Sequence, residues 1–173
     1  VVLRYFNVAG ASQDGLNGQR SRSATHLIKI ACEVALKQRP AIQIYGTDYE
    51  TPDGTGVRDY VHVEDLATAH VLAYEYLARG GSSQVLNCGY GQGHSVMEVL
   101  SAFERVNSVT LAKTPAPRRM GDVACLVADN QKIVNVLNWT PQHPNLESIC
   151  RSSFLWEQKF VKQNTLSVDH EIT

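Results

Sequence analysis

Short apolar runs rich in strand-forming residues alternate along this chain with segments of helical periodicity. The strand-like runs cover residues 1–7, 41–46, 84–89, 109–114 and 124–129. Between them, apolar side chains recur every three or four residues in segments that begin near residues 25, 64, 95, 129 and 145. Strands that alternate with helices are typical of α/β folds in which at least part of the sheet is parallel. We therefore predict an α/β chain whose first run is a buried strand.

Polar residues at the expected helix starts support these boundaries. Thr25 is predicted to cap the first helix, and Ser95 with Glu98 has the spacing of a capping box. Glu64 and Asp65 stand in the first turn of another helix, where the helix dipole favours negative charge. The basic residues and proline of 37–40 are predicted to end the first helix, and Arg79 stands near the end of the helix that begins at Glu64.

Two segments lack a clear pattern. Residues 12–23 are polar and aperiodic, which predicts a loop longer than compact domains usually carry without a function. The last helix is predicted to span residues 145–162, and the polar residues 163–173 after it are predicted to form a frayed tail.

The composition indicates a soluble, globular protein. The chain has 173 residues, is 43% hydrophobic and carries a formal net charge of -1. A domain of this length buries a sizeable core, and so small a charge favours neither nucleic acid nor a membrane surface as a partner. No apolar run approaches the roughly 20 residues that span a bilayer. We expect a cytoplasmic protein, and because Val1 stands where an initiator Met belongs, we expect a piece of a longer chain.

The cysteines and histidines suggest no metal site. Four cysteines, Cys32, Cys88, Cys125 and Cys150, are far apart in sequence and each stands among apolar neighbours. The six histidines form no cluster with metal-ligand spacing. We predict four buried, reduced thiols and no bound metal.

The familiar catalytic motifs are missing from the sequence. No glycine-rich dinucleotide loop, no Tyr-x-x-x-Lys pair, no Gly-x-Ser-x-Gly motif and no P-loop occurs. The chain itself is therefore predicted to hold no catalytic residue.

Arginines near carboxylates are the strongest candidates for binding. Arg58 follows the flexible Gly-Thr-Gly and can hold a phosphate with two parallel bonds, or it can pair with Asp59 or Glu64. Arg118 and Arg119 precede Asp122 on a proline-stiffened segment. They suit a phosphate and a ribose hydroxyl, and they suit surface ion pairs equally well.

Aromatic and polar residues also stand at strand ends, where open α/β sheets bind ligands. Tyr5, Phe6 and Asn7 close the first run, and Tyr45 closes the second. Each aromatic ring can contact a ligand or can pack in the core. His26 can likewise donate to a ligand or serve as a polar contact at a helix start.

A family resemblance is carried by five blocks in compatible order. They are LRYFNVAGA, THLI, IYGTDYETPDGTGVRDYVHVEDLATAHVLA, LNCGYGQGHSV and PAPRRMGD. Together they resemble the C-terminal half of the UDP-glucose 4-epimerase family, which belongs to the extended short-chain dehydrogenases/reductases. The similarity runs from Val1 to about Phe160.

The resemblance implies a fold, an activity and partners. Strands and helices of a Rossmann-type parallel sheet would come from residues 1–10 and about 58–90. A smaller α/β substrate-binding domain would come from about 11–57 and 91–162. The family interconverts UDP-glucose and UDP-galactose by reversible hydride transfer to NAD through a 4-keto intermediate, commonly as homodimers. Its glycine-rich loop and its catalytic Tyr/Lys pair would precede Val1, so the chain alone is expected to be inactive.

The resemblance also implies site residues, position by position. Arg58 and Arg119 would bind the diphosphate, Asp122 the uridine ribose, and Gln43 and Tyr45 the uracil, with His26, Leu27, Tyr60 and Val96 around the nucleotide. Asn7 would face the sugar, and Tyr5 and Phe6 the nicotinamide of NAD. Leu126 corresponds to a position whose bulk, in this family, affects whether N-acetylated sugars fit.

Other functions stay open. A related nucleotide-sugar enzyme, a UDP-glucuronate decarboxylase or a dTDP-glucose dehydratase, shares the Arg-Asp-Tyr core but less often the lead-in before it. A non-catalytic UDP-sugar-binding remnant is a further alternative.

Overall fold

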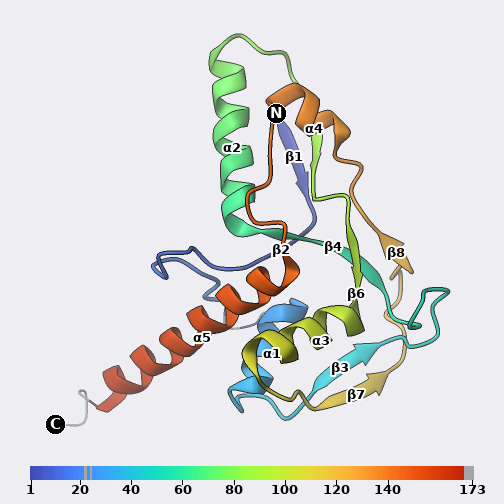
Figure 1. Cartoon of the computed structure of the whole chain (residues 1–173), viewed down its shortest axis with the longest axis vertical. Coiled ribbons are helices and arrows are strands. Elements are labelled where there is room, and N and C mark those ends of the chain that lie inside the picture. The colour runs from blue at the N-terminus through green and yellow to red at the C-terminus, as the bar shows by residue number, and fades with distance from the viewer. Residues whose placement is uncertain (22, 24, 170–173) are drawn as a thin grey trace.

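The computed structural model describes residues 1–21, 23 and 25–169, and it confirms the α/β class (Figure 1). The strands are β1 Val2–Tyr5, β2 Asn7–Ala9, β3 Ile42–Tyr45, β4 Val57–His62, β5 Val85–Cys88, β6 Gly93–Ser95, β7 Lys113–Ala116 and β8 Cys125–Leu126. The helices are α1 Leu27–Ala35, α2 Val63–Ala78, α3 Val96–Asn107, α4 Gln131–Leu137 and α5 Leu146–Asp169. No helix in this part of the chain is long and apolar enough to cross a membrane.

Most strand pairs are parallel, as the alternation predicts. β1 pairs with β5, β2 with β4, β3 with β7 and β4 with β8, all in parallel, whereas β4 and β6 are antiparallel. β4 is therefore the central strand of the largest sheet, and its residues meet strands from three distant parts of the chain.

The strand predicted over residues 1–7 is interrupted at Phe6, so β1 and β2 are separate strands. β1 pairs with β5, from Val2 opposite Val85 to Tyr5 opposite Cys88, while β2 pairs with β4. β1 is also not the buried strand that was predicted, since the exposed fraction is 55% for Val2 and 57% for Tyr5. Among the described strands β1 has one neighbour, so its other edge carries no strand.

The predicted helix starts are mostly confirmed. Ser95 and Glu98 form both bonds of the capping box at α3, and Glu64 and Asp65 lie in the first turn of α2. The predicted Thr25 cap is wrong, because α1 has His26 as its N-cap without a side-chain cap bond. α5 continues to Asp169, beyond the predicted end near residue 162, and residues 170–173 lie outside the described part.

Two predicted strands are displaced by tertiary contacts. The run 109–114 yields β7 only from Lys113 onward, because the Leu111 N–H donates to the carboxylate of Glu104 on α3 (2.7 Å). The run 124–129 yields only the two residues of β8, and beyond it the Ala128 N–H donates to Asp59 (3.2 Å). Side chains outside the two runs thus take up backbone donors that longer strands would need.

Two apolar clusters form the interior. The first joins α1, α3, α5 and β3 around Phe103 and Phe154, whose rings meet edge to face at 5.5 Å. The second joins α2, α4 and β5 around Trp139, whose indole N–H donates to the backbone oxygen of Asp65 (3.0 Å). The clusters correspond to the lower and upper parts of Figure 1. α4 packs in the second cluster, and the predicted domain division stays a prediction.

Three of the four cysteines are buried, and Cys125 on β8 is exposed, which corrects the prediction that all four are buried. β8 has only two residues and follows the exposed loop 117–124, so no described neighbouring segment covers the Cys125 side chain. Burial raises the pKa of Cys88 and of Cys150 to about 12, and it also raises the pKa of Cys32.

We expect one thiol to react in the native protein. A disulfide reagent added at neutral pH should modify Cys125 rapidly, since its thiol is exposed to the reagent, whereas the other three thiols are buried and have raised pKa values. The same titration in denaturant should reach four thiols, and replacing Cys125 with serine should abolish the fast native phase. Rapid native modification of more than one thiol would contradict the buried placement of the others.

Candidate functional site

A cleft of about 900 Å³ opens between α1, β3, β4 and the loop 117–124. Ten of the residues predicted to bind substrate line it, and they are Asn7, His26, Leu27, Gln43, Tyr45, Arg58, Tyr60, Val96, Arg119 and Asp122. These residues come from six separated stretches of the sequence. The fold therefore places these ten residues in one cleft, although those stretches are far apart in the sequence.

Arg58 lies on β4 and projects into the cleft. Its Nη2 donates to Asp122 Oδ1 at 2.6 Å, and its Nη1 donates to the Val57 backbone oxygen at 2.8 Å. The side chains of Arg58 and Asp122 are 16% and 35% exposed. Neither ion-pair alternative from the sequence, to Asp59 or to Glu64, is formed. The guanidinium instead faces the cleft, with Asp122 as its charged partner.

Asp59 turns away from Arg58 into the interior. Its carboxylate is fully buried and accepts from the N–H groups of Tyr90 (3.0 Å), Gly91 (2.9 Å) and Ala128 (3.2 Å). The alternation of side chains along a strand sends these neighbouring residues to opposite faces of β4. Asp59 therefore fixes the β5–β6 connection and the segment after β8, and Arg58 remains available to a ligand.

An aromatic and a cationic group close one end of the cleft. The Arg119 guanidinium lies over the Tyr45 ring, with its central carbon 3.9 Å from the ring centroid. The Tyr45 hydroxyl donates to the Gln43 side-chain oxygen. Tyr60 on β4 forms part of the wall, and burial raises the pKa of its phenol, against the opposing effect of Arg58, so that Tyr60 stays neutral. This end offers an aromatic ring with a positive charge over its face.

A smaller cavity of about 170 Å³ adjoins the cleft and shares Asn7, His26, Leu27 and Tyr60 with it. Tyr5 and Phe6 line this cavity at the end of β1. Sequence reasoning missed the ion pair in its wall, in which Lys29 Nζ donates to Glu157 Oε1 at 2.5 Å with both side chains buried. The sequence signal that could have suggested a carboxylate partner is Glu33, four residues after Lys29, and its Oε1 lies 3.5 Å from Lys29 Nζ.

Leu126 lies outside the cleft lining. It is on β8, opposite Arg58 in the parallel register, and is 51% exposed. Its role in selecting among sugars stays a prediction.

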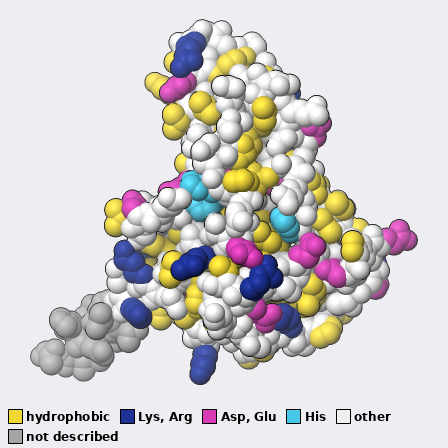
Figure 2. All heavy atoms as spheres, viewed as in Figure 1, with side chains coloured by type: hydrophobic (Ala, Val, Ile, Leu, Met, Phe, Trp, Pro, Cys, Tyr) yellow, Lys and Arg dark blue, Asp and Glu magenta, His cyan; other side chains and the backbone are white. Residues whose placement is uncertain are grey.

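The lower part of the molecule carries both signs of charge on the face shown in Figure 2. Figure 2 shows lysines and arginines interspersed with acidic residues over the lower part of the visible face. This mixture agrees with the small net charge and means that an anion has to be held by local contacts.

Sequence reasoning also missed a histidine pair formed by His62, at the end of β4, and His143, just before α5. His62 precedes α2 and is 2% exposed, and its ring centroid lies 4.8 Å from that of His143. Both rings face the Glu64 carboxylate, at 3.8 Å from His62 Nδ1 and 3.5 Å from His143 Nε2. From α5, the Ser152 hydroxyl lies 3.3 Å from His62 Nε2.

The protein is expected to lose stability as the pH falls, because His62 is held in its neutral form in the folded state. Burial, and next the neighbouring His143, lower the pKa of His62, although Glu64 and Asp65 act in the opposite direction. Unfolded histidine titrates near 6.5. Below that pH the unfolded chain binds a proton that the folded state disfavours, so the free energy of unfolding decreases.

Urea unfolding at pH 7, 6 and 5 measures this effect. Replacing His62 with glutamine should flatten the decrease, whereas replacing the exposed His70 on α2 with glutamine should leave it unchanged. Equal pH slopes for the wild type and His62→Gln would exclude His62 as the source.

Comparisons with known proteins give a consistent result. Residues 1–89 match the model of the NAD dependent epimerase/dehydratase family. The UDP-glucose 4-epimerase of Azospirillum brasilense is 53% identical over 158 residues, which are 91% of this chain and 45% of that protein. The chain thus spans about half the length of the curated relatives it matches.

Solved structures agree with this. The UDP-glucose-4-epimerase of Stenotrophomonas maltophila, crystallised with NAD and formylated UDP-arabinopyranose, is 41% identical with a TM-score of 0.89. The match covers 93% of this chain and 48% of that one. The Bifidobacterium longum enzyme with NAD+ and UDP is 38% identical, with a TM-score of 0.83 over 91% of this chain and 47% of that one.

Proposed function

The chain belongs to the NAD dependent epimerase/dehydratase family, and from this premise we propose that it forms the UDP-sugar-binding part of a UDP-glucose 4-epimerase. The observation that carries the proposal is the meeting, in one cleft, of ten residues that the family resemblance assigns to the substrate. The similar structures with bound UDP or a UDP-sugar support the same ligand class.

In the proposed complex the diphosphate lies between Arg58 and Arg119. Two guanidinium groups neutralise its charge and offer parallel N–H donors. Asp122, which now accepts from Arg58, would accept from the ribose hydroxyls instead. Binding thus exchanges one ion pair within the protein for ionic and hydrogen bonds to the nucleotide.

The base would lie at the Tyr45 end of the cleft. Tyr45 presents a flat ring and Gln43 a side-chain amide, and α1 begins beside them at Leu27. Holding the UDP firmly leaves the hexose free to turn between its two faces. The binding energy of the UDP group, which does not react, then helps to position the hexose for the reaction.

NAD would supply the reversible exchange of a hydride with C4 of the sugar. Among the described residues, Tyr5 and Phe6 would contact it. They fit this role because Tyr5 is an exposed aromatic side chain at the carboxyl end of a parallel strand, next to the smaller cavity. No residue of this chain is proposed to transfer a proton.

The complete enzyme is proposed to be a cytoplasmic homodimer that interconverts UDP-glucose and UDP-galactose. The test of its substrate-binding part is calorimetric titration of this chain with UDP, with dTDP and with NAD, each separately. We expect UDP to bind, dTDP to bind more weakly and NAD not to bind. Preference for dTDP would favour a dTDP-sugar dehydratase, and no UDP binding would overturn the proposed site in this chain.

A further inference from the structure

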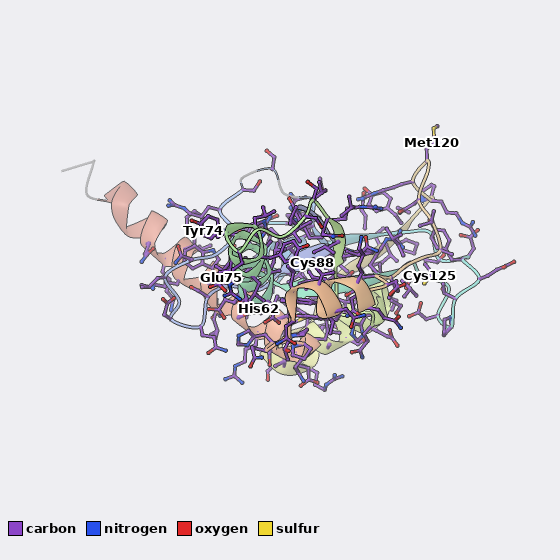
Figure 3. All side chains as sticks on the ribbon, turned by 90° about the horizontal axis from the view of Figure 1, so that it is seen from above. His62, Tyr74, Glu75, Cys88, Met120 and Cys125 are labelled. Atoms are coloured by element: carbon purple, nitrogen blue, oxygen red, sulfur yellow. The ribbon has the colours of Figure 1, made fainter. Side chains whose placement is uncertain are left out.

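The loop 117–124, which carries Arg119 and Asp122, has little packing of its own. Met120 at its tip is fully exposed and points away from the body, and Val123 is 48% exposed (Figure 3). Within the loop, the Asp122 N–H donates to the Arg119 backbone oxygen at 3.2 Å. The positions of Arg119 and Asp122 therefore depend on where the loop is attached to the rest of the protein.

Arg118 makes one of these attachments, outside the cleft. Its guanidinium lies over the Tyr49 ring at 4.2 Å, and its Nε donates to Asp48 Oδ1 at 2.8 Å. Its Nη2 donates in addition to the Asp48 backbone oxygen. Three contacts with two neighbouring residues fix both the plane and the direction of the side chain.

The segment that receives Arg118 is itself well held. Tyr49 is 7% exposed, and its N–H donates to the Gly54 backbone oxygen at 2.9 Å. Gly46 has φ of +76°, and a Cβ there would lie 2.5 Å from the Tyr49 ring and 2.9 Å from Arg118 Cγ. Glycine at this position is thus required for Arg118 to lie across Tyr49.

Arg118 and Arg119 are adjacent but face opposite ways. Arg119 lines the cleft over Tyr45, whereas Arg118 does not line it. The ion pair of Arg118 with Asp48 is exposed, at 47% and 72% for the two side chains, so it contributes little to the stability of the fold. A role in positioning its neighbour explains the specific geometry better than a role in stability does.

The second attachment through a charged side chain is the ion pair between Arg58 and Asp122. At the end of the loop, the Val57 N–H also donates to the Ala124 backbone oxygen at 2.8 Å. If the cleft binds a nucleoside diphosphate, as proposed above, the ion pair opens because both partners turn to the ligand. We propose that Arg118 is a positioning residue of the site, and that its clamp on Asp48 and Tyr49 keeps Arg119 and Asp122 over the cleft while the ligand binds. A loop held in this way avoids the ordering cost that a free loop incurs on binding.

The experiment compares UDP affinities of the wild type, Arg118→Met, Arg118→Lys, Arg119→Ala and the double variant Arg118→Met/Arg119→Ala by calorimetry. Arg118→Met should weaken UDP binding about tenfold, the ordering cost of one or two side chains. Arg118→Lys, which keeps a cation over Tyr49, should recover part of the loss. In the Arg119→Ala background, Arg118→Met should cost clearly less than tenfold, because Asp122 is then the only positioned binding group that remains.

Arg79→Met is the matched control, because it removes an exposed arginine–glutamate pair on α2. It should leave UDP affinity unchanged, and melting temperatures of all variants should agree. Wild-type affinity in Arg118→Met, or a full tenfold loss that persists without Arg119, would overturn the positioning role.

A second measurement needs no ligand and so separates this proposal from the proposed function. Hydrogen exchange of the amides in 117–124 should be faster in Arg118→Met than in the wild type or in Arg79→Met. Unchanged exchange would overturn the clamp even if UDP binds, and faster exchange would support it even if UDP does not.

Discussion

Replacing Arg58 with alanine is expected to weaken UDP binding by about 2–4 kcal/mol, a roughly 30- to 1000-fold rise in Kd. The guanidinium is mostly covered and lies in the wall of the cleft. Water that enters the space left by the side chain would not replace the charge and the N–H donors that Arg58 offers to the diphosphate. The variant also leaves the Asp122 carboxylate unpaired, where it repels the diphosphate. Calorimetric titration with UDP measures the change.

Arg105→Ala controls for the loss of an arginine. Arg105 pairs with Glu147 at the surface, where the two side chains are 65% and 44% exposed. An exposed pair of this kind is worth about 1 kcal/mol at most, and it lies away from the cleft. UDP affinity should therefore be unchanged in Arg105→Ala. The same affinity in Arg58→Ala as in the wild type would remove Arg58 from the binding site.

The largest loss of stability is expected for Asp59→Ala, at about 3–5 kcal/mol in the free energy of unfolding. The substitution leaves three N–H groups, of Tyr90, Gly91 and Ala128, without their shared acceptor in a buried place. The melting temperature should fall by roughly 6–20 °C, since each kcal/mol is worth about 2–4 °C in a chain of this size.

Asp59→Asn and Glu75→Ala sharpen this test. Asparagine has nearly the same shape but replaces one accepting oxygen with an N–H₂ group, so Asp59→Asn should still lose a large part of the stability. Glu75 lies on the exposed side of α2, where it pairs with Arg79, and Glu75→Ala should change the free energy by less than about 1 kcal/mol (Figure 3). Equal melting temperatures for Asp59→Asn and the wild type would mean that the three donors find other acceptors.

The helices were the most predictable part of the fold. The capping box of Ser95 and Glu98 is a local signal, and all four atoms that it joins lie within four residues. Strand ends were less predictable because they depend on partners elsewhere. β7 begins late because Glu104 takes up the Leu111 N–H, and no pattern within 109–114 reports that contact.

The candidate site was predictable residue by residue through the family resemblance, but its connections were not. That Arg58 meets Asp122, and that Arg118 lies over Tyr49, follows from how distant segments pack. The buried pair of Lys29 and Glu157 joins helices at opposite ends of the chain for the same reason. A single sequence records residue types and local spacing, and it does not record which distant charges meet.

The strand pairing described above also affects how fast the chain folds. None of the paired strands in the described part forms a hairpin, and the pair nearest in sequence joins Asp59 to Gly93. A chain without local strand contacts has to close long loops before any sheet can form, and such chains fold slowly. During synthesis, β1 would leave the ribosome long before β5, so the edge of β1 that pairs with β5 would stay unpaired until β5 is made. Early helix formation, and chaperones that shield open strands, would therefore favour the yield of this protein.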